Sequence, residues 1–172
     1  MRAVALVGGR LTEVDVDEPA LFQRLAANVV STNTALATGT LVTVFTSPTL
    51  AAGTYEWDCE GYYVSAATTT GLVIGYGFTV APASNLSGGR VENGAAVAAN
   101  VGGSNATTMT PAAPYLIGGT ASAGASTPLP FDLEGSFVLT APAALVVVMR
   151  SEIGGSAATV LAGSRFTVSR KA

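Results

Sequence analysis

The chain has 172 residues, which is enough for one domain with a sizeable core and too few for two ordinary domains. Hydrophobic residues make up 49% and charged residues only 11%, against roughly 25% charged residues in typical soluble domains. Either copies of the chain or neighbouring proteins cover much of its surface, or its exterior is built of Ala, Gly, Ser and Thr. Because the net charge is −3 with only eight cationic residues, we expect no nucleic-acid partner. Because the chain has no histidine, we also expect neither a zinc enzyme nor a Ser-His-Asp hydrolase.

The first 36 residues are predicted to form an N-terminal arm, distinct from a β-domain over residues 37–172. Pro19 occupies a first helical position, and Leu21, Phe22 and Leu25 follow with helical spacing, which predicts a short amphipathic helix over about 18–29. This helix either closes one end of the β-domain or docks on a neighbouring protein. The start of the chain lacks a secretory signal and no run approaches 18 apolar residues, so we expect cytoplasmic synthesis and no membrane partner.

From Thr40 onward the sequence alternates between apolar and polar residues with the period of β-strands. Turn residues separate the strands, which is typical of an antiparallel β-sandwich. Residues 81–128 are rich in small and polar residues, and we expect weak strands joined by long exposed excursions there. The predicted strands lie at 40–46, 54–65, 71–80, 86–92, 113–118, 131–140, 143–149, 158–161 and 164–170.

Two strands carry features that favour contact with another copy. Residues 143–149 are apolar on both faces, although a sandwich covers only one face of each strand, so Val146 and Val148 are candidate subunit-interface residues. Gly75 and Gly77 leave one face of the strand over 71–80 bare. They are candidates for close approach by a neighbouring strand or subunit, and a bend or bulge is the alternative.

The strand over 54–65 separates an aromatic face from an acidic one. Tyr55, Trp57 and Tyr63 face the predicted interior together with Cys59, the only cysteine, which we interpret as a small buried residue without a reactive role. Tyr76 also falls on an interior face. Tyr62 alone among these aromatic residues points outward, which leaves little for a sugar-stacking platform.

The acidic face is the one candidate for chemistry in the chain. Its residues are Glu56, Asp58 and Glu60, and Asp132 and Glu134 form a second row on a later strand. If the two strands are neighbours, a hard-cation site or a carboxylate pair for glycoside cleavage becomes possible. The favoured interpretation is a solvated strand face whose repulsion Arg150 or Arg165 offsets. No cofactor, metal or catalytic residue is therefore assigned.

Three segments resemble tailed-bacteriophage structural proteins with a TNF/C1q-like jelly-roll domain. These are Leu50-Ala-Ala-Gly-Thr-Tyr55, Ser65-Ala-Ala-Thr-Thr-Thr-Gly71 and Val160-Leu-Ala-Gly-Ser-Arg-Phe166. The resemblance covers about residues 40–170. It implies an all-β jelly-roll, trimeric association, a role in capsid decoration, head fibres or tail appendages, and no enzymatic activity.

The function expected from sequence is that of a homotrimeric capsid decoration or cement protein on the virion surface. Its partners would be other copies and the major capsid protein or other virion proteins. Leu21, Phe22 and Leu25 are then candidate capsid-attachment residues. The alternative is a tail or head-spike appendage that binds a host glycan or receptor through the excursions of residues 81–128.

Overall fold

The computed structural model describes residues 2–7, 10–15, 21–32, 41–68, 70–92, 114–118, 126–153 and 155–171. The described residues are all strand, turn and irregular structure, without a helix. The N-terminal strands are β1 (Arg2–Val7), β2 (Arg10–Asp15), β3 (Leu21–Arg24) and β4 (Val29–Thr32). The remaining strands are β5 (Val42–Thr46), β6 (Gly53–Ser65), β7 (Leu72–Phe78), β8 (Ser84–Val91), β9 (Tyr115–Gly118), β10 (Leu129–Leu139), β11 (Leu145–Ser151), β12 (Ala157–Val160) and β13 (Arg165–Lys171).

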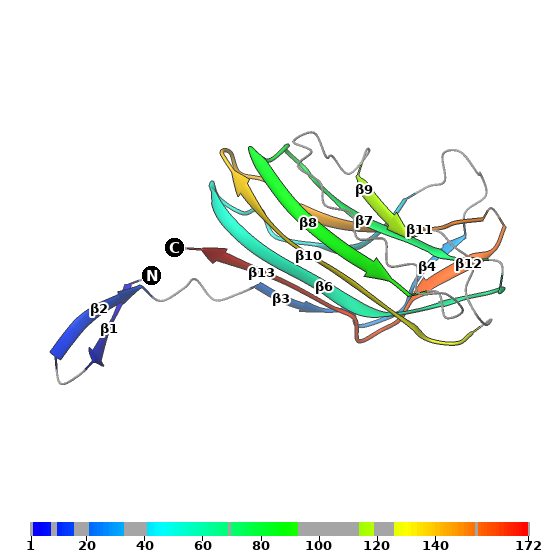
Figure 1. The fold of residues 1–172 in the computed structure, drawn as a ribbon, viewed down its shortest axis with the longest axis horizontal. Helices are drawn as coiled ribbons and strands as arrows, with labels where there is room; N and C mark the ends of the chain where they lie inside the picture. Colours follow the sequence, from blue (N-terminus) through cyan, green and yellow to red (C-terminus); the bar gives the residue numbers. More distant parts are fainter. Residues whose placement is uncertain are drawn as a thin grey trace.

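Two antiparallel sheets stack to form a sandwich (Figure 1). The seven-stranded sheet has the order β3-β13-β6-β10-β8, with β12 pairing β6 and β4. The four-stranded sheet has the order β5-β11-β7-β9. From β5 to β12 each successive strand crosses to the opposite sheet, which is the winding of a jelly-roll. The predicted fold class, an all-β antiparallel jelly-roll, is confirmed.

The core lies between the two sheets and is built from the alternating positions that the sequence pattern singled out. Aromatic rings meet across the gap: Phe45 stacks on Phe166 with centroids 5.5 Å apart, and Phe78 meets the edge of Phe137 at 4.8 Å. Such contacts add to the stabilisation that burial of these large side chains provides. The residues of β6 and β7 that were predicted to face the interior are buried: Tyr55, Trp57, Cys59, Tyr63 and Tyr76. Leu72, Ile74 and Phe78 of β7 are buried with them.

The predicted helix over 18–29 is wrong. Residues 21–24 form β3, which pairs with β13, and residues 29–32 form β4, which pairs with β12. Leu21 and Leu25 pack against the core while Phe22 is exposed, so burial alternates every residue as it does in a strand. Residues 18–20 and the predicted domain boundary at residues 36 and 37 lie outside the described residues.

Strands β1 and β2 form a two-stranded sheet of their own, with Arg2 opposite Asp15 and Leu6 opposite Leu11. No hydrogen-bonded pairing joins them to the other described strands. The weak strands predicted within residues 81–128 are present as β8 and β9, close to their predicted positions. Among the described residues there is no helix long and apolar enough to cross a membrane.

Candidate functional site

The two predicted rows of carboxylates lie side by side on the outer face of the seven-stranded sheet. Strands β6 and β10 are direct neighbours, with Glu60 opposite Asp132 and Asp58 opposite Glu134. Like charges placed directly opposite each other destabilise an antiparallel pair. Because side chains alternate between the two faces along both strands, these carboxylates form one continuous acidic stripe, defined here as Glu56, Asp58, Glu60, Asp132 and Glu134.

Cations on the strands that flank the stripe offset part of this repulsion. On β13, Arg165 pairs with Glu60 at 2.7 Å and Lys171 pairs with Glu56 at 2.6 Å. These side chains are about half exposed, so the pairs add little to stability, and their effect is to balance the charge of the face. The predicted counter-ion role of Arg165 is confirmed, whereas Arg150 lies on β11 in the other sheet. Lys171 was not singled out as a counter-ion from the sequence, although the strand period places it on the same face of β13 as Arg165.

Burial, more than the neighbouring charges, shifts the pKa values of the two aspartates in the stripe. Burial raises the pKa of Asp58, and the nearby Glu60 and Glu134 carboxylates act in the same direction, against Arg165 and a hydrogen bond with Thr167. Burial likewise raises the pKa of Asp132, in spite of Arg90 on β8. Both carboxyls are therefore easier to protonate than a fully exposed aspartate.

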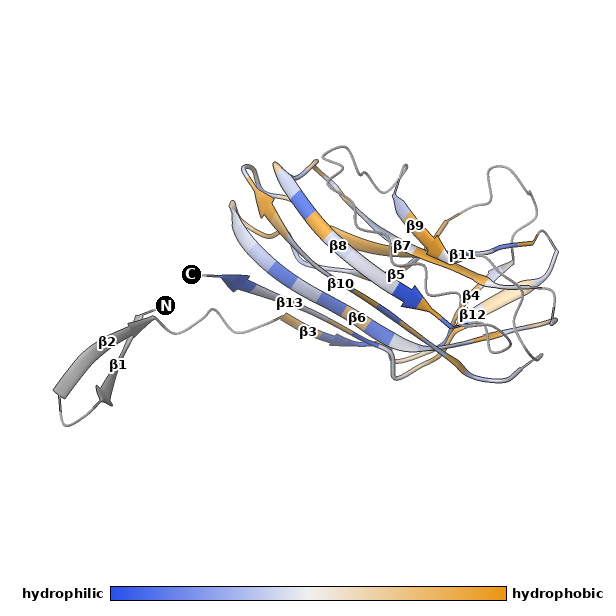
Figure 2. Cartoon of the chain, viewed as in Figure 1, coloured by the Kyte–Doolittle hydropathy of each residue, from blue (hydrophilic) through white to orange (hydrophobic). Residues whose placement is uncertain are grey.

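Large apolar side chains stand exposed on the same face. Phe22 on β3 and Leu86 on β8 are each 61% exposed, and Tyr62 on β6 is 56% exposed. The pairing register places Phe22 in line with Thr167 and Asp58, and places Leu86 in line with Ser136 and Glu56. The polar stretches of β6 and β13 and the apolar position on β8 are visible in Figure 2. Exposed aromatic and aliphatic groups beside charges are typical of protein interaction surfaces.

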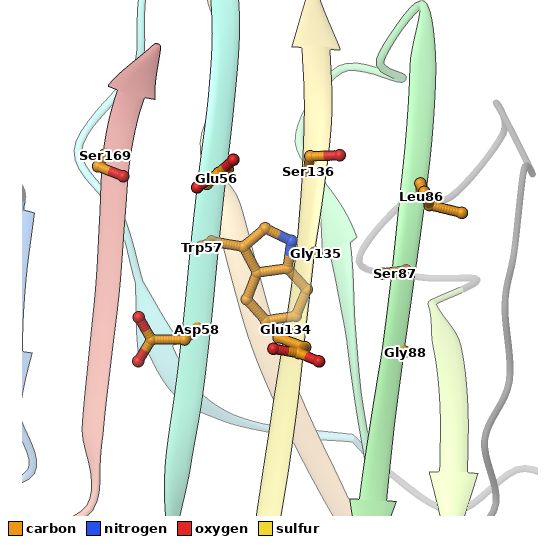
Figure 3. Close-up of a pocket in the computed structure, with 10 residues that line it drawn as sticks. All are labelled: Glu56, Trp57, Asp58, Leu86, Ser87, Gly88, Glu134, Gly135, Ser136 and Ser169. Carbon is orange, nitrogen blue, oxygen red and sulfur yellow. The ribbon is translucent and has the colours of Figure 1, made fainter.

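Shallow hollows lie on this face, and two of them are formed by described residues of the acidic stripe and its surroundings. The larger, of about 540 Å³, lies over β6, β10 and β8 (Figure 3). It is lined by Glu56, Trp57, Asp58, Leu86, Ser87, Gly88, Glu134, Gly135, Ser136 and Ser169. The smaller, of about 380 Å³, includes Phe22, Arg24, Tyr62 and Arg165. Both are open depressions on a sheet face, and the acidic side chains of the described residues form no group of three or more that could hold a metal ion.

The predicted interface residues lie on the other sheet. Val146 and Val148 are 7% and 3% exposed within the single chain, on the face of β11 that points away from the core. β9 is the neighbour of β7 in the same sheet and approaches Gly75 closely, because a Cβ atom at residue 75 would be 1.7 Å from the Tyr115 carbonyl oxygen. This confirms the neighbouring-strand interpretation for Gly75. A role of these residues and of Gly77 in a subunit interface stays a prediction.

The predicted attachment residues separate in the structure. Phe22 points outward, whereas Leu21 and Leu25 pack against the core and are available to a partner only in part. Tyr62 is exposed, as the strand alternation predicted. Leu86 and Arg24 were not singled out, because an isolated apolar or basic residue in a short segment gives no signal until the strands are placed side by side.

Comparisons with known proteins give likeness of fold only. No family model matches the chain, and no curated protein matches it. Among solved structures, Eiger TNF from S. frugiperda is 14% identical, with a TM-score of 0.42, over 90% of this chain and 94% of that one. The structure of infectious bursal disease virus Gt strain is 15% identical with a TM-score of 0.24, and the VP2 subviral particle of that virus is 13% identical with a TM-score of 0.23. This chain spans 45% and 44% of those two viral chains.

Proposed function

We propose that this chain is a non-enzymatic structural protein of a bacteriophage virion, which forms a homotrimer and decorates or cements the capsid. The observation that supports the proposal is the outer face of the seven-stranded sheet. Phe22, Tyr62 and Leu86 stand exposed there beside a charged stripe, which suits burial against another protein better than contact with water.

Charge on this face favours a second copy of the chain as the first partner. The centre of the sheet is acidic, while the β3–β13 margin carries Arg24, Arg165 and Lys171. Arg165 and Lys171 already pair with Glu60 and Glu56 of their own chain. A cyclic arrangement in which Arg24 of one copy meets the rest of the acidic stripe of the next, Asp58 and Glu134, places opposite charges together at each contact. Three such contacts close a ring, and the many weak contacts of a ring with a capsid lattice add through multivalency.

The test of the trimer is the molar mass in solution. Light scattering after size exclusion is expected to give three times the chain mass for the wild type. Replacing Phe22 and Tyr62 together by serine is expected to lower that mass while the circular dichroism stays that of the folded protein. Val80→Ser is the matched control, since Val80 is 45% exposed and lies in the connection between β7 and β8, outside the strands of this face. A wild-type protein that is monomeric at every concentration overturns the trimer.

The test of the capsid role is binding to expanded phage heads that lack this protein. Co-sedimentation with the heads, and a raised temperature of head disruption, are the expected results. Absence of binding, combined with a positive signal on a glycan array or on host cells, would instead support a receptor-binding appendage.

A further inference from the structure

Four polar side chains gather inside the otherwise apolar sandwich. They are Trp57 on β6, Tyr76 on β7, and Asn85 and Ser87 on the inward face of β8, and each is at least nine-tenths buried. The Trp57 and Tyr76 rings lie 4.7 Å apart. The Asn85 amide nitrogen donates to the Tyr76 hydroxyl at 2.8 Å, and the Tyr76 and Ser87 hydroxyls are hydrogen-bonded to each other. We call these four residues the buried polar cluster.

The hydrogen bonds within the buried polar cluster do not use all of its donors and acceptors. Trp57 Nε1 and Asn85 Oδ1 are buried and have no hydrogen-bond partner in the described part of the protein. The Tyr76–Ser87 bond also uses only one of its two hydroxyl protons, so one hydroxyl proton is left whichever residue donates. The second amide proton of Asn85 is directed at Ser87 Oγ, 3.5 Å away. The cluster therefore offers two donors, an indole N–H and a hydroxyl, and one acceptor, an amide oxygen.

The geometry directs the free indole donor toward the rest of the cluster. Figure 3 shows the Trp57 ring extending from β6 toward Gly135 on β10, with its nitrogen on the side of β8 and Ser87. Gly135 lets Ser87 of the adjacent strand approach closely, since a Cβ atom at residue 135 would lie 2.6 Å from the Ser87 Cβ. Leaving a buried polar group without a partner costs about 1–3 kcal/mol, so native proteins fill such sites.

We propose that the buried polar cluster binds one water molecule between the two sheets. The water accepts from the Trp57 indole and from the remaining hydroxyl proton, and it donates to Asn85 Oδ1. These three hydrogen bonds match the usual number for a buried water. An anion has no cation to balance it in the cluster, and a cation meets N–H and O–H donors, so a small neutral molecule is the ligand class that fits.

The decisive experiment uses the single tryptophan of the chain. A ¹⁵N-labelled sample gives one indole N–H signal, and water-selective NOE and ROE spectra should show a cross-peak to it with the signs of a long-lived bound water. The cross-peak should persist in Ser87→Ala and Tyr76→Phe, each of which removes one hydroxyl that could relay magnetisation. A crystal structure should place an ordered water within hydrogen-bond distance of Trp57 Nε1 and Asn85 Oδ1. A direct Trp57–Asn85 hydrogen bond, or no cross-peak in the folded wild type, overturns the proposal.

A double-mutant cycle provides a second measurement that tolerates some loss of stability. Trp57→Phe and Asn85→Leu each leave the water with one partner fewer, so the double variant should lose less in urea midpoint than the sum of the two single losses. The control cycle combines Trp57→Phe with Tyr63→Phe. Tyr63 lies six residues further along β6 than Trp57, and its hydroxyl donates to the Glu92 carbonyl. The stability losses of these two variants should therefore add. Additive losses in the first cycle also contradict the proposal.

Discussion

Gly135 shows how a single position sets the packing between β10 and β8. It faces inward opposite Trp57, and an added Cβ would lie 2.6 Å from the Leu86 carbonyl oxygen. Because backbone cannot move aside cheaply, Gly135→Ala is expected to lower the free energy of unfolding by about 1–3 kcal/mol. Urea denaturation followed by circular dichroism measures this. The neighbouring Ser136→Ala, on the outer face, is the control and should change it by less than about 0.5 kcal/mol.

Asp58 makes the stability of the fold depend on pH. Its pKa in the folded protein is raised above the ordinary 3.8, chiefly by burial, so folding favours the protonated carboxyl. That contribution is present in full below about pH 3.8 and is lost as the pH rises through the folded pKa. We therefore expect Asp58→Asn to have a higher urea midpoint than the wild type at pH 7, with the difference vanishing near pH 3.

The control for this prediction is the other end of the same acidic row. Glu56→Gln removes the partner of Lys171, so it should leave the midpoint at pH 7 unchanged or slightly lower. If Asp58→Asn also lowered the midpoint at pH 7, attraction to Arg165 would outweigh burial, contrary to the expectation.

At the scale of elements, Gly75 determines whether β9 can join the four-stranded sheet. It pairs with Leu116, and the Tyr115 carbonyl oxygen occupies the space of a side chain. Gly75→Ala is expected to displace β9 and to cost about 1–3 kcal/mol. Hydrogen exchange should then speed up in the peptide that contains residues 115–118 and stay slow in β10 of the same sample. Equal acceleration in both peptides would mean that the two sheets unfold together.

The strands were predictable wherever one face alternates over many residues, as in β6 and β10. The helix prediction failed because Leu21 and Leu25 are spaced by four, which satisfies both a helical face and the even spacing of a strand. What decided between the two was not local: β3 pairs with β13, more than 140 residues away along the chain. Long-range pairing of this kind overrides a weak local pattern.

The candidate site was predictable as two acidic rows but not as a surface. Each row followed from alternation along one strand, whereas their contact depends on β6 pairing with β10. The exposed Phe22 and Leu86 join the same face only because β3 and β8 are the two edges of that sheet order. Strand order is set by the packing of the whole sandwich, which a single sequence does not reveal.

At the scale of the whole molecule, we expect residues 1–20 to be dispensable for folding and trimer formation, and residues 21–25 to be needed for both. Strands β1 and β2 pair only with each other among the described strands, so removal of residues 1–20 is expected to change the free energy of unfolding by less than about 0.5 kcal/mol. Removal of residues 1–25 also deletes β3 and the packing of Leu21 and Leu25, and should cost roughly 2 kcal/mol or more.

The same two truncations test where the copies meet. The shorter truncation retains Phe22 and Tyr62, so light scattering should still report three chains, while the longer one removes Phe22 together with Arg24 of the basic margin and should yield monomers. Phe22→Ser in the full chain separates this loss of contact from loss of stability, because an exposed side chain contributes little to folding. A monomeric product from the shorter truncation would place the trimer contact in residues 1–20 and remove the sheet face from that role.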